Sequence, residues 1–137
     1  HWLRSQGNKV AIVTGGPREV AEAAMVLFEA DAIFSNEFLY EAGVFTGAVR
    51  VRVSPRLKGE LVRDLAARWR VDREHILAFG DGLMDVPLLA EAGVRLGINS
   101  NGKLRDHVDF EPRDYVDARQ WLLDTGALHG TKGERKA

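Results

Sequence analysis

Short apolar runs alternate with amphipathic stretches along this chain. Mostly apolar runs, as expected of strands buried on both faces, predict strands over residues 9–13, 31–35, 76–79 and 94–98. Apolar residues at helical spacing predict helices over residues 19–28, 58–69, 85–92 and 117–124. Strands that alternate with helices in this way are typical of an α/β fold with a mostly parallel sheet.

Residues 37–53 show a different pattern, in which apolar and polar positions alternate on both sides of a turn. The turn is Glu41-Ala42-Gly43, and the flanking residues predict the two strands of a β-hairpin. This stretch is long enough for a flap but not for an inserted domain. Residues 108–110 predict a short edge strand, and residues 2–7 are typical of the last turns of a helix that ends at a glycine.

Composition and charge indicate the extent of the folded core and limit the kinds of partner that we expect. We expect one core over residues 1–125 and a flexible, glycine-rich, charged tail over residues 126–137. The net charge of -1 gives no electrostatic case for a nucleic-acid or membrane partner. The chain has no cysteine, which excludes disulfides and thiolate metal sites, and no apolar run that could cross a bilayer. We therefore expect a cytoplasmic protein.

The first candidate for chemistry is the turn Gly80-Asp81-Gly82. It lies between a predicted strand and a predicted helix whose first turn carries Asp85. In an open α/β sheet, ligands bind beyond the carboxyl ends of the strands, so Asp81 stands where chemistry is usually done. Taken alone, the motif is equally consistent with an ordinary turn closed by an Asx-type hydrogen bond.

Two further stretches are suited to an anion. Thr14-Gly15-Gly16 separates a buried strand from a helix start, so that a hydroxyl, backbone N–H groups and the helix dipole could hold an oxyanion. Lys58 opens the next predicted helix, where a cation is unfavourable unless an anion lies close to it. An ordinary βα turn and a solvated lysine are the alternatives.

A hydroxyl with an N–H, a lysine and a pair of carboxylates are the parts that phosphoryl transfer needs. With these parts in this order, the chain resembles the haloacid dehalogenase (HAD) superfamily of phosphohydrolases, in its phosphoserine phosphatase-like branch. The resemblance runs nearly from end to end and rests on the stretches VAIVTGG, VFTGAVRVRV, KGELVRDLA, FGDGLMDVPLLAEAGVRLGI and EPRDYVDARQWLL. It implies a three-layer, Rossmann-like α/β core with a mostly parallel sheet and a β-hairpin flap.

The resemblance also implies roles for single residues. Thr14 and the Gly15 N–H would bind the phosphoryl oxygens, and Lys58 would neutralise the phosphate and the nucleophile. Asp81 would be a catalytic ligand of Mg²⁺, and Asp85 would support the metal through water or hydrogen bonds. The implied reaction is Mg²⁺-dependent hydrolysis of a small phosphorylated metabolite, with phosphoserine as the leading substrate, through a phospho-aspartyl intermediate.

The chain departs from the family pattern in two places. Met84 stands where an asparagine usually contacts the phosphate, and a thioether cannot donate that hydrogen bond. The nucleophile motif DxDxT has no match, since Asp31 starts its strand and Asp109 lies in a short late segment. In the family this motif ends the central strand of the sheet. We therefore expect the chain to be the C-terminal portion of a longer protein, inactive alone, whose first strand and helical cap lie upstream.

Three other hypotheses remain. A non-catalytic phosphate-binding or regulatory relative would explain Met84. The phosphorylation domain of an ion-pumping ATPase shares the GDG turn, but it usually has an acidic residue where this chain has Thr14-Gly15-Gly16 and it requires membrane helices. A purely structural α/β domain would require all the motifs to coincide by chance. The histidines are scattered and show no metal-ligand spacing.

Overall fold

The computed structural model describes residues 1–128, which form two compact units. The first unit is His1–Ser54, and the second begins at Pro55. Both combine helices with parallel strand pairs, which confirms the predicted α/β class. Of the tail expected over residues 126–137, only residues 126–128 are described, with Gly126 capping the last helix at a φ of 66°. The rest of that tail lies outside the described residues.

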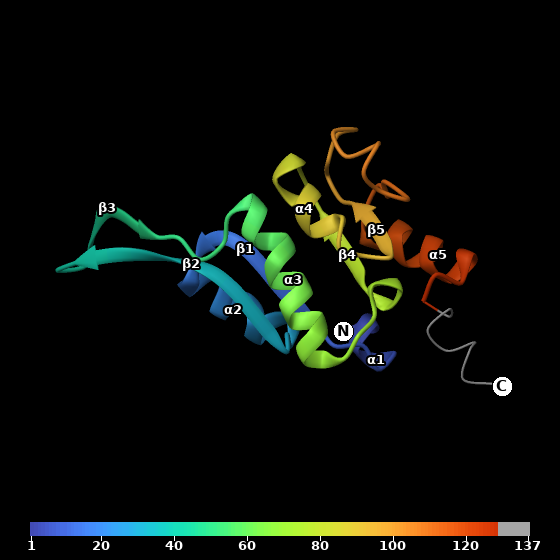
Figure 1. Cartoon of the computed structure of the whole chain (residues 1–137), viewed down its shortest axis with the longest axis horizontal. Coiled ribbons are helices and arrows are strands. Elements are labelled where there is room, and N and C mark those ends of the chain that lie inside the picture. Colours follow the sequence, from blue (N-terminus) through green and yellow to red (C-terminus); the bar gives the residue numbers. More distant parts are fainter. Residues whose placement is uncertain (129–137) are drawn as a thin grey trace. The chain divides into compact units, whose positions relative to one another are not determined.

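The first unit is a three-stranded sheet with a helix between its first two strands (Figure 1). Strand β1 pairs in parallel with β2, and β2 pairs antiparallel with β3 to make the predicted hairpin. Its elements are α1 (Trp2–Ser5), β1 (Ala11–Pro17), α2 (Arg18–Phe28), β2 (Ala32–Glu41) and β3 (Val44–Arg50).

The strands of this unit differ from the prediction at two points. Residues 14–17, predicted as a turn, continue β1 in an irregular register, and the two short strands predicted around Asn36 are one continuous strand. The hairpin ends at Arg50 and not at Val53, because the N–H groups of Arg52 and Val53 donate to the side chain of Asn36. A buried side chain thus takes the place of a strand partner.

The second unit is built on the parallel pair β4–β5, in register from Leu77 opposite Val94 to Gly80 opposite Gly97. Its elements are α3 (Pro55–Trp69), η1 (Arg73–His75), β4 (Leu77–Gly80), η2 (Leu83–Asp85), α4 (Val86–Leu89), β5 (Val94–Gly97) and α5 (Tyr115–Thr125). The most deeply buried large side chains are Leu89, Leu96, Leu104 and Leu122.

Two predicted elements of this unit are shorter than expected. A helix was expected over residues 85–92, but the structure has the turn η2 followed by the short helix α4. The Gly93 N–H donates to the carbonyls of Arg73 (2.9 Å) and Ile76 (3.1 Å), which is not compatible with a helix that continues to this residue. The edge strand expected over residues 108–110 is a single bridge from Phe110 to Leu96. None of the described helices has the length and apolar character needed to cross a membrane.

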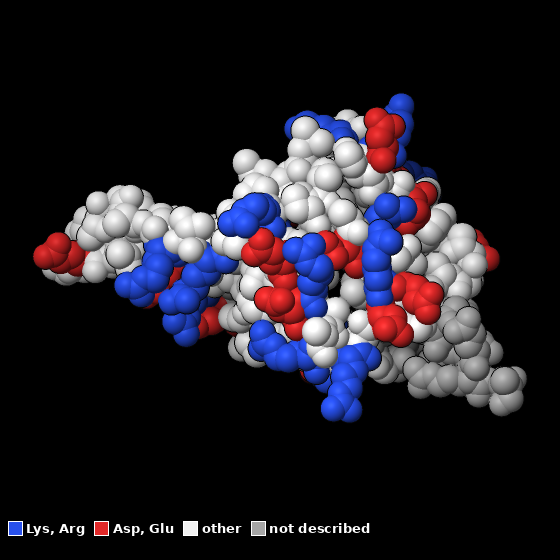
Figure 2. Space-filling view, viewed as in Figure 1, with Lys and Arg blue, Asp and Glu red and all other residues white. Residues whose placement is uncertain are grey.

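Charged side chains of both signs lie next to one another on the face shown in Figure 2. The described residues include ion pairs with largely exposed side chains, such as Arg18–Glu22 and Arg56–Glu60. Ion pairs this exposed each contribute little to stability, about 0–1 kcal/mol. The fold therefore depends on its apolar packing and on close backbone contacts.

The closest of these contacts near the candidate site involve two glycines. A Cβ on Gly59, in the first half of α3, would lie 2.9 Å from the backbone oxygen of Pro87 in α4. A Cβ on Gly80, at the end of β4, would lie 2.8 Å from the Cβ of Asp85. Real side chains do not tolerate such distances, so only glycine allows α3 and β4 to approach the segment that carries Asp85.

This geometry predicts that Gly59→Ala destabilises the protein, although alanine in a helix interior normally stabilises by about 1 kcal/mol. The clash with Pro87 should reverse the sign and cost about 1–3 kcal/mol, as overpacking does. Urea denaturation measures the effect. Ala67→Gly, at an exposed position of the same helix, calibrates the ordinary propensity difference, and a stabilising Gly59→Ala would contradict the close approach.

Candidate active site

Lys58 and Asp85 form the centre of the candidate site. Lys58 extends from the first turn of α3, and Asp85 closes η2 at the start of α4. Lys58 Nζ donates to Asp85 Oδ1 at 2.6 Å, and each side chain is only 13% exposed. The predicted anion beside Lys58 is therefore, within this chain, a carboxylate that lies 27 residues away in sequence.

The second oxygen of Asp85 holds the turn that carries Asp81. Asp85 Oδ2 accepts from the Asp81 N–H at 3.0 Å, and the Asp85 N–H donates to the Gly82 carbonyl at 2.9 Å. These two bonds close the loop between β4 and η2. One carboxylate thus fixes both the lysine and the backbone of Asp81.

The charge state of Asp85 follows from these contacts. Burial raises the pKa of Asp85, but the hydrogen bonds from Lys58 and from the Asp81 N–H outweigh it and leave the pKa below the ordinary 3.8. Asp85 is therefore ionised at neutral pH and balances the Lys58 ammonium in a site with little solvent.

Asp81 offers a carboxylate to a ligand. It directly follows β4, at the carboxyl end of the parallel pair, and it is exposed. Mg²⁺ takes oxygen ligands and is often held by one or two carboxylates together with water and phosphate. The exposed Asp81 beside the ionised Asp85 fits such an ion, with Asp85 suited to a supporting role because both of its oxygens already accept hydrogen bonds.

The other predicted site residues, Thr14 and Gly15, lie near the end of β1 in the first unit. The Gly16 N–H donates to Thr14 Oγ1 at 3.0 Å, which leaves the hydroxyl hydrogen of Thr14 able to donate to an incoming oxygen. Gly15 is exposed. The structure thus brings Lys58, Asp81 and Asp85 together in one unit and places Thr14 and Gly15 side by side in the other.

Met84 is one of two large apolar side chains exposed in the turn next to Asp81. Met84 is 70% exposed and its neighbour Leu83 is 60% exposed. The position of the usual asparagine is therefore open to solvent, and Met84 brings an apolar surface to it.

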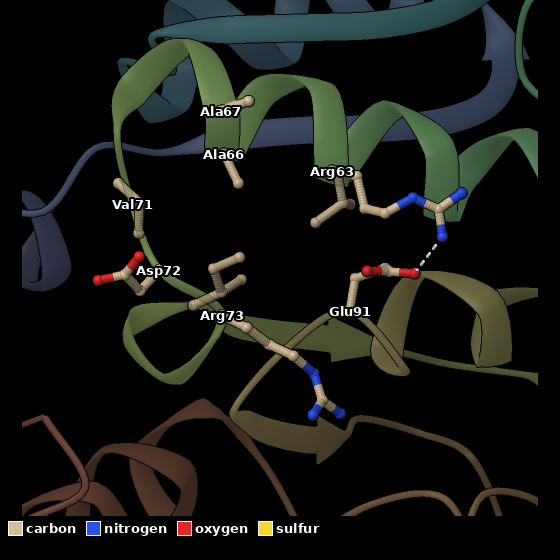
Figure 3. A pocket seen from close by; sticks show the side chains of 9 residues that line it. Arg63, Ala66, Ala67, Val71, Asp72, Arg73 and Glu91 are labelled. Atoms are coloured by element: carbon tan, nitrogen blue, oxygen red, sulfur yellow. Dashed lines mark hydrogen bonds and ion pairs between the residues drawn. The ribbon is translucent and has the colours of Figure 1, made fainter.

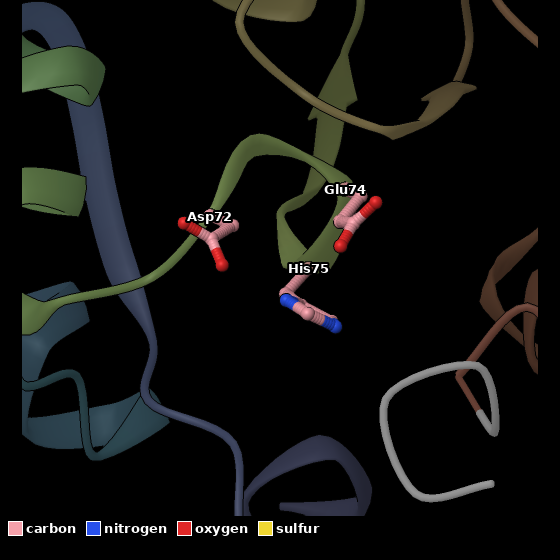
Figure 4. Close-up of side chains that lie close together, drawn as sticks. All are labelled: Asp72, Glu74 and His75. Carbon is pink, nitrogen blue, oxygen red and sulfur yellow. The ribbon is translucent and has the colours of Figure 1, made fainter. Parts of the chain in front are cut away.

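Sequence reasoning missed a group of possible ligands at the opposite, amino end of β4. Asp72, Glu74 and His75 are exposed, and a ligand atom of each lies within 4.8 Å of the others (Figure 4). The signal was the run Asp-x-Glu-His over η1, which brings all three side chains together in a tight turn. Exposed acidic groups often gather without an ion, so this cluster does not by itself make a metal site.

Hollows in the second unit also lie at the amino end of β4. One of about 240 Å³ is lined by apolar side chains, such as Ala66 and Val71, and by charged ones that include the Arg63–Glu91 ion pair (2.6 Å; Figure 3). Another, of about 390 Å³, is lined by Asp72, Arg73, Glu74 and Gly93. Neither is lined by Asp81 or Lys58.

Comparisons with known proteins identify a family and sequence relatives of this chain. Residues 1–90 match the haloacid dehalogenase-like hydrolases. Phosphoserine phosphatase SerB2 of Mycobacterium tuberculosis is 31% identical over 98% of this chain and 32% of its own length. Phosphoserine phosphatase of Archaeoglobus fulgidus is 30% identical over 78% of this chain and 31% of its own length. The chain thus spans about a third of the length of these two relatives.

Solved structures show the same similarity. A phosphoserine phosphatase in its apo form matches with a TM-score of 0.79 and 25% identity, over 90% of this chain and 61% of that one. A phospho-aspartyl intermediate analogue of phosphoserine phosphatase matches with a TM-score of 0.81 and 25% identity, over 88% of this chain and 59% of that one. These findings confirm the resemblance to the phosphoserine phosphatase-like branch.

The Lys58–Asp85 pair predicts a specific dependence of stability on pH. In metal-free buffer at neutral pH, Asp85→Asn should lower the free energy of unfolding by about 1–3 kcal/mol, because it leaves the partly buried Lys58 ammonium without its partner. Since folding lowers the pKa of Asp85 from 3.8, its contribution is complete above that value and is lost as the pH falls through the lower folded value.

Urea denaturation over a series of pH values measures this effect. The difference between the wild-type protein and Asp85→Asn should shrink as the solution is acidified below about pH 4. Asp64→Asn, at an exposed position on α3, is the matched control and should follow the wild-type curve. Parallel curves for wild type and Asp85→Asn would show that the pair does not hold Asp85 ionised.

Proposed function

The chain belongs to the haloacid dehalogenase-like hydrolase family, and on that premise we propose that the complete protein is a magnesium-dependent phosphomonoester hydrolase. The observation that carries the proposal is the partly buried Lys58–Asp85 pair beside the exposed carboxylate of Asp81 at the end of β4. A fixed cation next to an available carboxylate is suited to a phosphoryl group and its metal ion.

Each predicted residue has a distinct part in this chemistry. Lys58 neutralises charge on the phosphoryl group, and Thr14 with the Gly15 N–H binds its oxygens. Asp81 would hold Mg²⁺, with Asp85 supporting it, and a bound Mg²⁺ would supply further charge neutralisation. Because Lys58 is already held by Asp85, little reorganisation is needed when phosphate arrives.

The reaction also needs a nucleophile, which we propose is an aspartate on a strand supplied by a segment that precedes this chain. Among the described strands, β1 pairs only with β2 and β4 pairs only with β5. Each of these strands therefore has an edge that could accept a parallel neighbour, and the unpaired backbone groups of such edges are costly when buried.

Two aspartates of this chain, Asp31 and Asp109, are poor candidates for that nucleophile because each is already paired with an arginine. Asp31 lies before the amino end of β2 and accepts from Arg4 at 2.6 Å, and Asp109 accepts from Arg95 at 3.0 Å. In the proposed reaction, the carboxylate supplied by that segment attacks phosphorus, the bond from phosphorus to the ester oxygen breaks, and the departing oxygen takes up a proton to leave as the alcohol. Water then attacks the phosphorus of the acyl phosphate and gives up a proton, which releases inorganic phosphate and restores the carboxylate.

The substrate class is a small phosphorylated metabolite, and phosphoserine is the first candidate. The relatives named above are phosphoserine phosphatases, and this similarity is the support for the substrate. The choice among metabolites would depend on the cap, which we place in the same preceding segment. A cytoplasmic location remains an expectation from the absence of cysteine.

The proposal predicts phosphate release from a phosphomonoester by the complete protein when Mg²⁺ is present, and its loss in excess EDTA. Asp81→Asn and Lys58→Ala should each lower kcat/KM by about 10²- to 10³-fold, as the removal of a charge-stabilising group does. Asp64→Asn serves as the control and should retain wild-type activity. Full activity in EDTA, or in Asp81→Asn, would contradict the assigned metal site.

The alternative function, phosphate binding without turnover, is favoured by one observation, the exposed thioether of Met84 where an amide would contact phosphate. Under the proposed hydrolase function, Met84→Asn adds one hydrogen bond and should change kcat/KM by no more than about tenfold. Steady-state phosphate release measures the change. Undetectable turnover in the wild type, restored by Met84→Asn, would establish the non-catalytic alternative.

A further inference from the structure

Asn36, in β2, is a buried polar residue whose side chain uses all of its hydrogen-bonding capacity. It is 7% exposed. Its Nδ2 donates to the carbonyls of Gly15 (3.1 Å) and Val53 (3.0 Å). Its Oδ1 accepts from the N–H groups of Arg52 (2.7 Å) and Val53 (2.8 Å). A carboxamide offers two donors and two acceptor lone pairs, and here all four are engaged.

These four bonds connect three segments of the first unit. They join the end of β1, the middle of β2 and the chain that follows β3, which enters α3 two residues after Val53. The side chain of Asn36 is a partner for all four of these backbone groups, so an apolar side chain would leave each of them without that bond. Asn36 therefore sets the position of the backbone on both sides of β2.

The bond to Gly15 acts directly on Thr14-Gly15-Gly16, the stretch predicted to bind phosphate, which we call the phosphate cradle. The Gly15–Gly16 peptide has its carbonyl held by Asn36 and its N–H held by Thr14 Oγ1. A peptide unit fixed at both ends cannot rotate. Because Thr14 Oγ1 accepts that N–H, its own hydrogen remains available to donate to another acceptor, such as a phosphoryl oxygen. The Asn36 amide also packs beneath Gly15, 3.8 Å from the position of a Cβ there.

We propose that Asn36 is a positioning residue for phosphate binding, which orients the Gly15–Gly16 peptide and, through it, the hydroxyl of Thr14. Asn36 does not touch the phosphate itself. The inference rests on the proposed function, in which Thr14 and Gly15 bind the phosphoryl oxygens. It adds a buried residue, from a different strand, on which the geometry of that cradle depends.

The test compares Asn36→Ala and Asn36→Ser with wild type in the complete protein, with inorganic phosphate as a competitive probe. The inhibition constant for phosphate and the KM for the monoester should both rise by about 10- to 100-fold, as when positioning groups are removed. The kcat should fall by less. Asn36→Ser can still donate one hydrogen bond, so it should show a smaller rise, and it decides the matter if Asn36→Ala does not fold.

A double-mutant cycle with Thr14→Val separates positioning from stability. If Asn36 acts through Thr14, Asn36→Ala should change the phosphate inhibition constant by less than about twofold once Thr14 is replaced. Ile33→Ala, on the same strand, is the control that lowers Tm without touching the cradle, and its phosphate inhibition constant should stay at the wild-type value.

The possible failures are distinguishable. An active wild-type protein whose Asn36 variants lose only Tm, as Ile33→Ala does, would overturn the positioning role and leave the proposed function intact. Fully additive effects of Asn36→Ala and Thr14→Val would also overturn it. A wild-type protein that neither releases phosphate nor binds inorganic phosphate would overturn the proposed function and this inference with it.

Discussion

The contact between Lys58 and Asp85 is the interaction on which the candidate site depends. It joins the first turn of α3 to the end of η2, and it exists because two glycines allow the backbone to come close. Gly59 lets α3 approach Pro87, and Gly80 lets the segment of Asp85 approach the end of β4. A carboxylate placed there can hold the lysine with one oxygen and the Asp81 N–H with the other. The site is thus built into the packing of the second unit.

The pairing of the strands leaves one edge of β1 and one edge of β4 without a partner among the described strands. Both β1 and β4 carry candidate ligands at or just beyond their carboxyl ends, and among the described strands each pairs on one side only. A parallel strand that carries an aspartate at its own carboxyl end would bring the nucleophile to the same edge as Asp81. The proposal of a nucleophile from a preceding segment therefore follows from strand edges as well as from the absent DxDxT motif.

Local patterns predicted much of the fold because strands, helices and the hairpin follow from periodicity within short stretches. The shortening of α4 was not predictable, since it comes from bonds between Gly93 and the carbonyls before β4, which only the folded chain brings together. The same holds for the end of β3, which is set by the side chain of Asn36.

The site was predicted in part for the same reason. A lysine at a helix start indicated a nearby anion, but sequence gave no means to choose between a ligand and a distant carboxylate, and Asp85 is that carboxylate within the chain. Asn36 was not predicted to be important, because it lies between two stretches with ordinary strand patterns. Its importance comes from four hydrogen bonds that connect three segments, and the hydrophobic pattern of the sequence does not predict such bonds.

The central proposal is that this chain supplies the metal-binding and phosphate-binding residues of a phosphohydrolase whose nucleophile comes from a preceding segment. The most direct measurement is to sequence the gene upstream of the codon for His1. The account predicts an open reading frame that encodes an apolar strand ending in DxDxT. An in-frame stop codon directly upstream, followed by a start codon close to His1, would contradict it and would favour a phosphate-binding protein without turnover.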